Sequence, residues 1–406
     1  MSTTATAVRA AVPAYLGSDF ADAAPGHRFY LYLEAWDSKW QKPKDKQPAL
    51  ETLARLNPGD RQRMEALAAR QQFLAGEAET QAPGCVFSLP ACSVAPFTTG
   101  LGIEHPLENG FAFLAPYGLP YLPGSSVKGV LRQAARELGD EDGGFERADR
   151  DWTRGDIHAL FGHDGATDGE YGNAGRSRGA LIFWDVLPVL PKDAALQWEV
   201  MTPHHGPYYK DASGGTAPHD NGAPVPINFL TVPARSGFRF HVQCDQALLR
   251  ERAAHLLEGE AWQAVLRELF VHAFEWLGFG AKTSVGYGEM SVDTDTLERE
   301  RAAREAQRRE AEKRSKREAM PAGERLAAEL LEGRTDESQP VYKFLLEQLD
   351  AGCVPEVNAA DFARVVLESL EQRRSELKRI SNKKKRQKRL EELAHDEARL
   401  RAMMEE

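Results

Sequence analysis

The sequence predicts an α+β protein, with a strand-rich core between a helical N-terminal region and a long charged helical extension. Between about residues 84 and 292, short apolar or alternating segments separated by glycine and proline are typical of strands. Only two segments in that region have clear helical periodicity. From about residue 296 the composition changes to Glu, Arg, Lys and Ala, which is typical of a solvated helix. We therefore expect three parts, residues 1–84, 85–295 and 296–406.

The first part is expected to be peripheral. Residues 1–27 are rich in alanine and lack periodicity, which indicates a loosely attached arm. The apolar segment Phe29–Leu33 could be a strand, and residues 48–74 have helical spacing that is interrupted at Asn57-Pro58-Gly59.

The core is expected to contain strands and two helices. In the segment 238–244, Phe238 and Phe240 alternate with Arg239 and His241, which is the pattern of a half-buried strand. The other strand candidates are residues 85–89, 180–187, 228–232 and 289–292. The apolar stripes predict helices from Ser125 or Ser126 to Leu138 and from Ala261 to Leu277. Strands separated by single helices favour ferredoxin-like units over a doubly wound sheet.

The third part combines charged helices with a small helical unit. A long charged helix is expected from residue 296, and a second one carries the basic run 383–389. Three shorter helices are expected between them, at residues 324–331, 341–349 and 361–370. We expect residues 296–406 to be an appendage that packs on another molecule or moves freely, because the charged helices have little apolar surface.

Composition limits the function classes. The net charge is −10, and residues 1–295 hold 26 Lys and Arg against 37 Asp and Glu, so any RNA site in the core must be local. The four cysteines form neither a CxxC pair nor a disulfide ladder, which predicts a reducing cytoplasmic location and no zinc site. No apolar run is long enough to predict a signal peptide or a membrane span.

The first candidate phosphate site is a loop followed by a helix. Pro123-Gly124 forces a turn, and Ser125 and Ser126 offer a helix cap with free backbone N–H groups at a positive helix end. Lys128 and Arg132 are four residues apart and therefore share a helix face. The alternative is an ordinary capped helix with solvated basic residues.

The second candidate is the glycine-rich loop 278–288. Glycines such as Gly280 and Gly286 let the backbone approach a ligand closely, and Lys282, Thr283 and Ser284 add a charge and two hydroxyl groups. Tyr287 lies in the same loop. The alternative is a turn in which glycine serves only tight packing between a helix and a strand.

A third segment concentrates histidines and aromatic residues. His204, His205 and Tyr208 lie in a loop rich in glycine and proline. Stacking of RNA bases or a structural histidine is the favoured interpretation. A metal site is a weaker alternative, because it needs three convergent ligands and adjacent histidines on an extended chain point to opposite faces. A ribonuclease that uses one imidazole as base and another as acid is also a weaker alternative. No catalytic set stands out elsewhere.

Together these segments resemble the RAMP superfamily of type III CRISPR systems, and within it the family of sixth subunits of the type III-B (Cmr) complex. The resemblance covers roughly residues 87–292. The segments that carry it are residues 99–102, 105–110, 120–132, 179–185, 202–205 with 208–209, 224–232 and the loop 278–288.

The resemblance implies tandem ferredoxin-like (RRM-like) units with the glycine-rich loop facing guide RNA. It implies a non-catalytic subunit, without cofactor or small-molecule substrate, at the 3′ region of the guide RNA and target RNA duplex, beside other Cmr (RAMP) subunits. Two alternatives remain: a RAMP-type endoribonuclease that processes guide RNA through His204 or His205, and a purely structural assembly subunit. The charged extension and the N-terminal arm depart from the family pattern, so their roles stay open.

Overall fold

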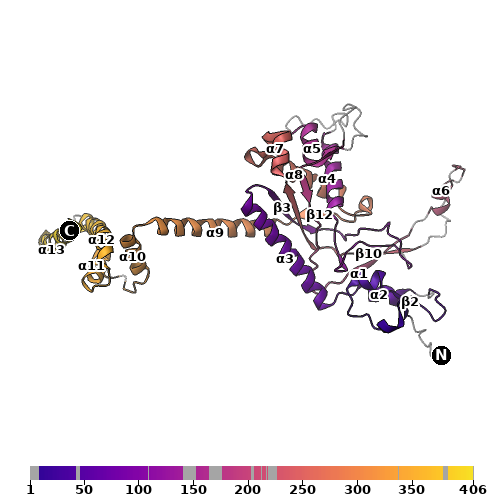
Figure 1. The fold of residues 1–406 in the computed structure, drawn as a ribbon, viewed down its shortest axis with the longest axis horizontal. Coiled ribbons are helices and arrows are strands. Elements are labelled where there is room, and N and C mark those ends of the chain that lie inside the picture. The colour runs from indigo at the N-terminus through magenta and orange to yellow at the C-terminus, as the bar shows by residue number, and fades with distance from the viewer. Residues whose placement is uncertain are drawn as a thin grey trace. The chain divides into compact units, whose positions relative to one another are not determined.

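The computed structural model gives the fold of two compact units, Met1–Leu297 and Glu298–Glu406 (Figure 1). The residues that it describes are 9–42, 46–107, 109–139, 152–163, 176–202, 205–211, 213–215, 217, 226–336, 338–377 and 383–405.

The first unit is built on a four-stranded antiparallel sheet. Its strands are β3 (Val86–Ser93), β8 (Leu181–Phe183), β11 (Gly237–Cys244) and β12 (Met290–Val292), in the spatial order β12-β3-β11-β8. Along the chain, β3 and β8 form one strand–helix–strand unit, and β11 and β12 form a second one. The two units interleave in the sheet, because β11 lies between β3 and β8, and β3 lies between β11 and β12. The connections contain α4 (Gly124–Gly139) and α5 (Arg154–Phe161) in the first, and α7 (Gln246–Ala253) and α8 (Ala261–His272) in the second.

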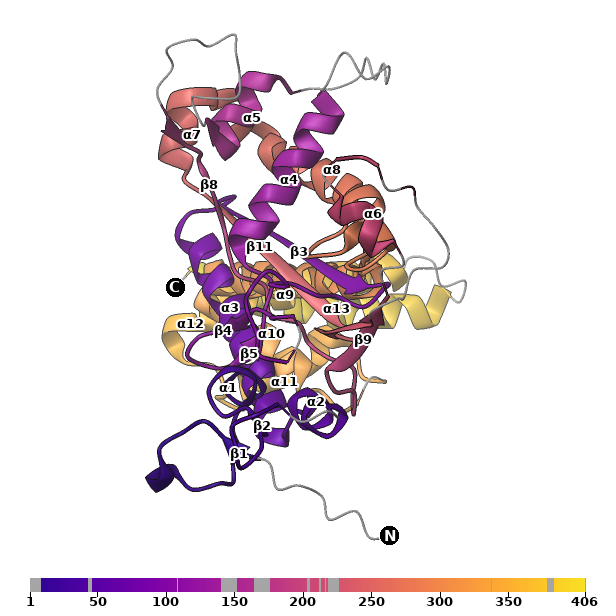
Figure 2. The same ribbon diagram turned by 90° about the vertical axis from the view of Figure 1, so that its right-hand side faces the viewer.

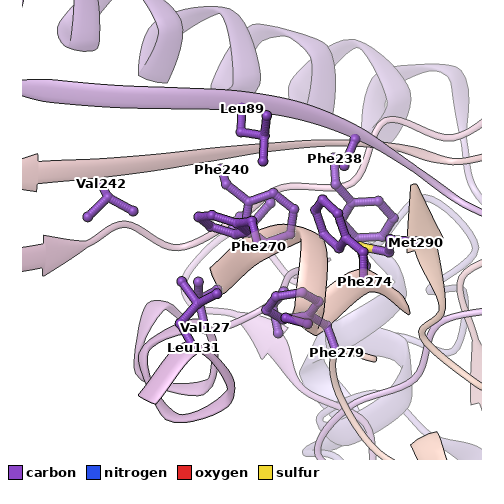
Figure 3. Packing of buried hydrophobic residues seen from close by; sticks show 14 of the residues in the cluster. Leu89, Val127, Leu131, Phe238, Phe240, Val242, Phe270, Phe274, Phe279 and Met290 are labelled. Carbon is purple, nitrogen blue, oxygen red and sulfur yellow. The ribbon is translucent and has the colours of Figure 1, made fainter. Parts of the chain in front are cut away.

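The hydrophobic core lies between this sheet and the helix pair α4 and α8, which pack side by side (Figure 2). Alternate residues of β3 and β11 point to these helices, and Phe270 of α8 packs against both Phe87 and Phe240. Val127 and Leu131 of α4 and Phe279 from the glycine-rich loop complete this side of the core (Figure 3). A fully buried phenylalanine contributes about 1.5–3 kcal/mol through its removal from water.

The opposite face of the sheet carries α3 (Pro58–Gln81), which lies above the strands in Figure 3. A capping box in which Asn57 and Asp60 bond each other's backbone N–H groups begins this helix. At its other end the Glu79 carboxylate accepts hydrogen bonds from the backbone N–H groups of Gly84 and Val86, which fixes the start of β3.

Shorter elements complete the first unit. Its N-terminal region holds β1 (Arg9–Ala10), the 3-10 turn Ala14–Leu16, α1 (Pro25–Tyr30), β2 (Glu34–Trp36) and α2 (Gln47–Ala54). Strands β1 and β2 pair with each other. Three further two-stranded sheets pair β4 (Phe113–Leu114) with β5 (Leu119–Pro120), β6 (Gly162–His163) with β7 (Ser177–Arg178), and β9 (Gln197–Met201) with β10 (Ile227–Thr231). The short helix α6 (Gly206–Lys210) lies in the connection from β9 to β10. The 3-10 turns Ala254–Glu260 and Thr283–Val285 and the π-helical turn Ala273–Leu277 flank and follow α8.

The second unit is helical and has its own core. Its helices are α9 (Thr294–Ala319, which begins in the first unit), α10 (Ala322–Glu332), α11 (Val341–Asp350), α12 (Glu356–Leu377) and α13 (Lys383–Glu405). Leu345, Phe362, Val366 and Leu400 are fully buried in a cluster contributed by α10 to α13. The residues beyond 296 are therefore more than a charged appendage.

The predicted mixture of helix and sheet is confirmed, with β3, β8, β10, β11, β12, α4 and α8 at the predicted places. The strand predicted at Phe29–Leu33 is wrong, because Pro25 starts α1, which includes Phe29 and Tyr30, and the residues that follow to Leu33 form a turn. Phe29 is fully buried and stacks on His105 at 3.9 Å between ring centroids, so tertiary packing overrides the strand propensity of this segment. Phe29, Leu33 and Leu50 belong to the main core, so the N-terminal region is not peripheral.

In the described part of the chain, no helix combines the length and the apolar character that a membrane crossing requires.

Candidate nucleic-acid interface

The structure brings the two predicted phosphate sites to the same side of the sheet. Helix α4 packs against the π-helical turn Ala273–Leu277, and the glycine-rich loop emerges from that turn. Val127 of α4 and Phe279 of the loop enter the same core (Figure 3). The two elements are therefore held by one hydrophobic cluster, although the sequence separates them by about 150 residues.

The start of α4 is largely closed to a phosphate group. The Gly124 N–H donates to Asp185 Oδ1 at 2.8 Å, and the N–H groups of Ser126 and Val127 donate to the Pro123 carbonyl. Asp185 places a negative charge at the positive helix end, where it stabilises the helix and repels an approaching phosphate. Gly124 is needed for packing, because a Cβ there would lie 2.3 Å from the carbonyl oxygen of Phe183.

The side chains of this helix that the sequence predicts as ligands are only partly available. Ser125 is exposed and Ser126 is half-buried. Lys128 and Arg132 are half-buried, and both already have interaction partners within the chain. The structure therefore keeps the predicted basic face of α4 but does not leave it uncommitted.

The glycine-rich loop has a base whose glycines are required by packing. Gly278, Gly280, Gly286 and Gly288 all have positive φ. A Cβ on Gly280 would lie 2.2 Å from the Thr98 carbonyl oxygen, and one on Gly288 would lie 1.9 Å from that of Phe279. At these two positions, tight packing is sufficient to explain why the residue is glycine. Gly286 is different, because a Cβ added there would have no atom within 4 Å.

Backbone hydrogen bonds fix the base of the loop and leave the tip exposed. The N–H of Ala281 donates to the Thr98 carbonyl at 2.8 Å, and the N–H of Gly288 donates to the Pro96 carbonyl at 2.9 Å. Phe279 is fully buried beneath them. The tip, Ser284 to Gly286, is exposed, so the loop presents a short surface on a rigid support.

Lys282 connects the loop to the hairpin formed by β9 and β10. Its Nζ lies 3.0 Å from Met201 Sδ and 5.0 Å from the centroid of the Phe229 ring, which is a cation–π geometry. The side chain is half-buried, and its backbone is left-handed with φ of 60°. The predicted phosphate ligand thus also has a packing role.

Tyr287 forms the second connection to this hairpin. Its ring meets Phe229 edge-on at 5.3 Å, and its hydroxyl lies 3.5 Å from Glu199 Oε2. Burial, followed by the negative charge of Glu199 and the hydrogen bond to it, raises the pKa of Tyr287. The phenol therefore stays protonated, and Glu199 makes this side of the loop less attractive to phosphate. Thr283 is half-buried against Gly278.

Sequence reasoning missed Trp276, which directly precedes the loop. Its side chain is 75% exposed, although it belongs to the π-helical turn that ends a buried helix. Val285 at the tip is also exposed. The signal was present in the sequence, because Trp276 falls outside the apolar stripe of residues 261–277 and an aromatic residue there has no core to enter.

The histidine segment does not form a recognisable catalytic group. His204 lies outside the described residues. His205 precedes α6, is half-buried, and has a buried Nδ1 atom without a hydrogen-bond partner among the described residues. Tyr208 is exposed, and its ring lies 5.2 Å from that of Tyr209, which is 77% exposed. Among the described side chains, no group of three His, Cys, Asp or Glu could hold a metal ion.

Comparisons with known proteins match the region that contains these elements. The family model described as the RAMP superfamily matches residues 93–291. The chain is 29% identical over 229 residues to a Pyrococcus furiosus protein described as CRISPR system Cmr subunit Cmr6, covering 47% of this chain and 63% of that protein. It is 23% identical over 181 residues to a Cmr6 protein of Saccharolobus solfataricus, covering 44% and 47%. The match thus spans less than two thirds of the length of both relatives.

Solved structures give weaker likenesses. A type III-B Cmr-beta complex bound to cognate target RNA contains a chain with a TM-score of 0.41 and 17% identity, covering 61% of this chain and 70% of that one. The crystal structure of Cmr6 from Pyrococcus furiosus has a TM-score of 0.28 and 26% identity, covering 51% and 97%.

Proposed function

We propose that this chain, which the RAMP superfamily model matches over residues 93–291, is a non-catalytic, RNA-binding subunit of a type III-B CRISPR (Cmr) effector complex. The two curated relatives, both described as Cmr6, support this assignment. The proposed partners are the guide RNA in its 3′ region, the target RNA paired with it, and other Cmr subunits. The cell compartment that follows from this role is the cytoplasm.

The proposal extends to the fold of the core. The strand order β12-β3-β11-β8, with helices between the first and second and between the third and fourth strands along the chain, has the connectivity of a ferredoxin-like unit. A tandem arrangement would need a second such sheet. Within the described ranges the remaining sheets have two strands each, so one ferredoxin-like unit is the form that we propose.

The observation that carries the function is the glycine-rich loop with its rigid base and exposed tip. Lys282 is left-handed and is followed by the 3-10 turn Thr283–Val285. Successive N–H groups in such an alternation converge on one point and can bind an anion. The Ser284 hydroxyl is exposed beside them, and the exposed Trp276 ring offers a surface for base stacking. A single-stranded RNA backbone with one unstacked base fits this combination.

Two features support a binding role over catalysis. His205 lies in a half-buried position, and no second described imidazole is paired with it as an acid or base. The loop itself supplies hydroxyls, amides and one lysine, which bind phosphate but do not by themselves supply the two proton-transfer groups that RNA cleavage uses.

Replacing Lys282 with methionine tests the proposal. Methionine keeps an unbranched side chain against Met201 and Phe229 but removes the charge. If Lys282 contacts a phosphate, the slope of log K against log salt for single-stranded guide RNA should decrease in magnitude by about 0.7. The Lys282→Arg variant, which keeps the charge, should retain the slope of the unaltered protein. Fluorescence anisotropy at several salt concentrations measures both.

The same preparations separate the alternatives. Incubation with repeat RNA should leave the RNA intact. Cleavage that disappears in His205→Ala would overturn the non-catalytic assignment and favour guide processing. An assembled complex in which ultraviolet crosslinking attaches no RNA to this chain would favour a purely structural subunit.

A further inference from the structure

Beyond Leu297, which packs against the core of the first unit, helix α9 (Thr294–Ala319) has no apolar surface that would explain its sequence. None of its residues is buried, and from residue 301 to 316 every side chain is exposed. Residues 301–317 contain eight Lys and Arg against three Asp and Glu, a net charge of +5 in a chain of −10. A local excess of this size attracts polyanions.

Three ion pairs form within α9 between residues four apart. Arg301, Arg308 and Arg314 each pair with the glutamate four residues later, namely Glu305, Glu312 and Glu318, at 3.4, 3.3 and 2.8 Å. Such exposed pairs add only about 0.3–0.5 kcal/mol each to stability. Their structural effect is to occupy three of the acidic side chains of the helix.

Other basic residues of the helix are left without an acidic partner. Arg304, Arg309, Lys313 and Lys316 are exposed, and within the described ranges no ion pair engages them. Of these, Arg309, Lys313 and Lys316 are spaced by four and three residues and therefore share one face. They span about 10 Å along the helix axis. Ala302 and Ala306 continue this face toward the N-terminus and leave it sterically open.

The helix dipole does not account for this stripe. Cations stabilise a helix only within its last turn. Lys316 is in the last turn of α9, but Arg309 lies ten residues before the end and Lys313 six. The stripe also lacks the aromatic and apolar residues that the centre of a protein interface buries. Phosphate binding needs only such cations, so RNA is favoured over an acidic protein.

We propose that Arg309, Lys313 and Lys316 form a second binding surface for the phosphate backbone of RNA, on the helical unit and outside the region matched by the family model. This surface binds RNA independently of its sequence, because it contacts phosphates only. It goes beyond the proposed function, since it does not depend on the glycine-rich loop.

A matched pair of triple variants of the full chain tests this surface. Arg309, Lys313 and Lys316 are replaced by glutamine in one variant, and the ion-paired Arg301, Arg308 and Arg314 in the other. Both variants lose three positive charges, and glutamine retains helix propensity. Binding of a fluorescent single-stranded RNA is measured at several salt concentrations, and circular dichroism checks that both variants remain helical.

The stripe variant should lower the magnitude of the salt slope by about 2, from three contacts at about 0.7 each, whereas the control variant should lower it by less than half as much. Equal losses in the two variants, an unchanged slope in the stripe variant, or no RNA binding by the unaltered chain would overturn the proposal. The proposal would also be overturned if the stripe variant no longer bound an acidic protein partner while the salt slope of its RNA binding stayed unchanged.

The proposed function can fail separately. If Lys282→Met binds RNA like the unaltered chain while the stripe variant loses its slope, the glycine-rich loop is not a phosphate site and the surface on α9 stands.

Discussion

Gly280 and Gly286 have the same backbone φ of +96° but different surroundings. A Cβ on Gly280 would collide with the Thr98 carbonyl and the Phe97 ring, whereas one on Gly286 would enter open space. Gly280→Ala should lower the free energy of unfolding by at least about 2 kcal/mol, because strain and overpacking add. Gly286→Ala should lower it by about 1 kcal/mol, from backbone strain alone. Urea unfolding measures both values.

The comparison of these two glycines also checks the support of the loop. Equal losses in the two variants would mean that the Thr98 contact is not formed and that the base of the loop is not fixed as described.

Lys282 shows how much of a residue's role can be predicted from its type and its neighbours in the sequence. A lysine among glycines predicts a phosphate contact, and that prediction stays open. The contacts with Met201 and Phe229 could not be predicted, because β9 and β10 precede Lys282 by more than 50 residues in the sequence. A substitution that removes the whole side chain would therefore mix the loss of charge with the loss of packing.

At the scale of elements, the π-helical turn Ala273–Leu277 controls what the loop presents. The Gly278 N–H donates to the Ala273 carbonyl at 2.8 Å and ends the turn. Trp276 is thereby held on the surface immediately before the loop, while Phe274 and Phe279 on either side of it are buried.

Replacing Trp276 with alanine should weaken binding of single-stranded RNA by about 1–3 kcal/mol, the usual effect of losing one base stack. Stability should change little, since the ring is mostly exposed. Phe73→Ala, at an exposed aromatic residue of α3, is the matched control and should leave RNA affinity unchanged. Titration of fluorescent RNA measures both. Equal affinity of the Trp276→Ala variant and the unaltered chain would remove Trp276 from the interface.

At the scale of the whole molecule, the chain has two separate hydrophobic clusters. Leu297 packs against the cluster of the first unit, whereas the cluster of the second unit begins at Ala327. Helix α9 has no buried residue.

Because each unit has a hydrophobic cluster of its own, we expect two unfolding transitions and not the single cooperative transition of a small domain. A fragment of residues 1–303, which keeps Leu297, should be soluble and unfold at the same urea midpoint as the first unit in the full chain. Denaturation followed by tryptophan fluorescence reports this unit, because all seven tryptophans lie before residue 297. Aggregation of the fragment, or a lower midpoint, would show that the second unit stabilises the first.

Local patterns in the sequence were sufficient to predict several elements. Alternation predicted β11, apolar stripes predicted α4 and α8, and the change of composition near residue 296 marks the start of α9. The closely spaced glycines identified the loop 278–288, because a backbone with positive φ favours glycine over other residues.

How these elements are used depends on the tertiary structure. It places Asp185 at the start of α4, Lys282 against Phe229, and Phe29 in a buried helix in place of a strand. The physical reason is the same in each case. A side chain's role depends on neighbours that are distant in sequence, and their packing and charge outweigh the local preference of the residue.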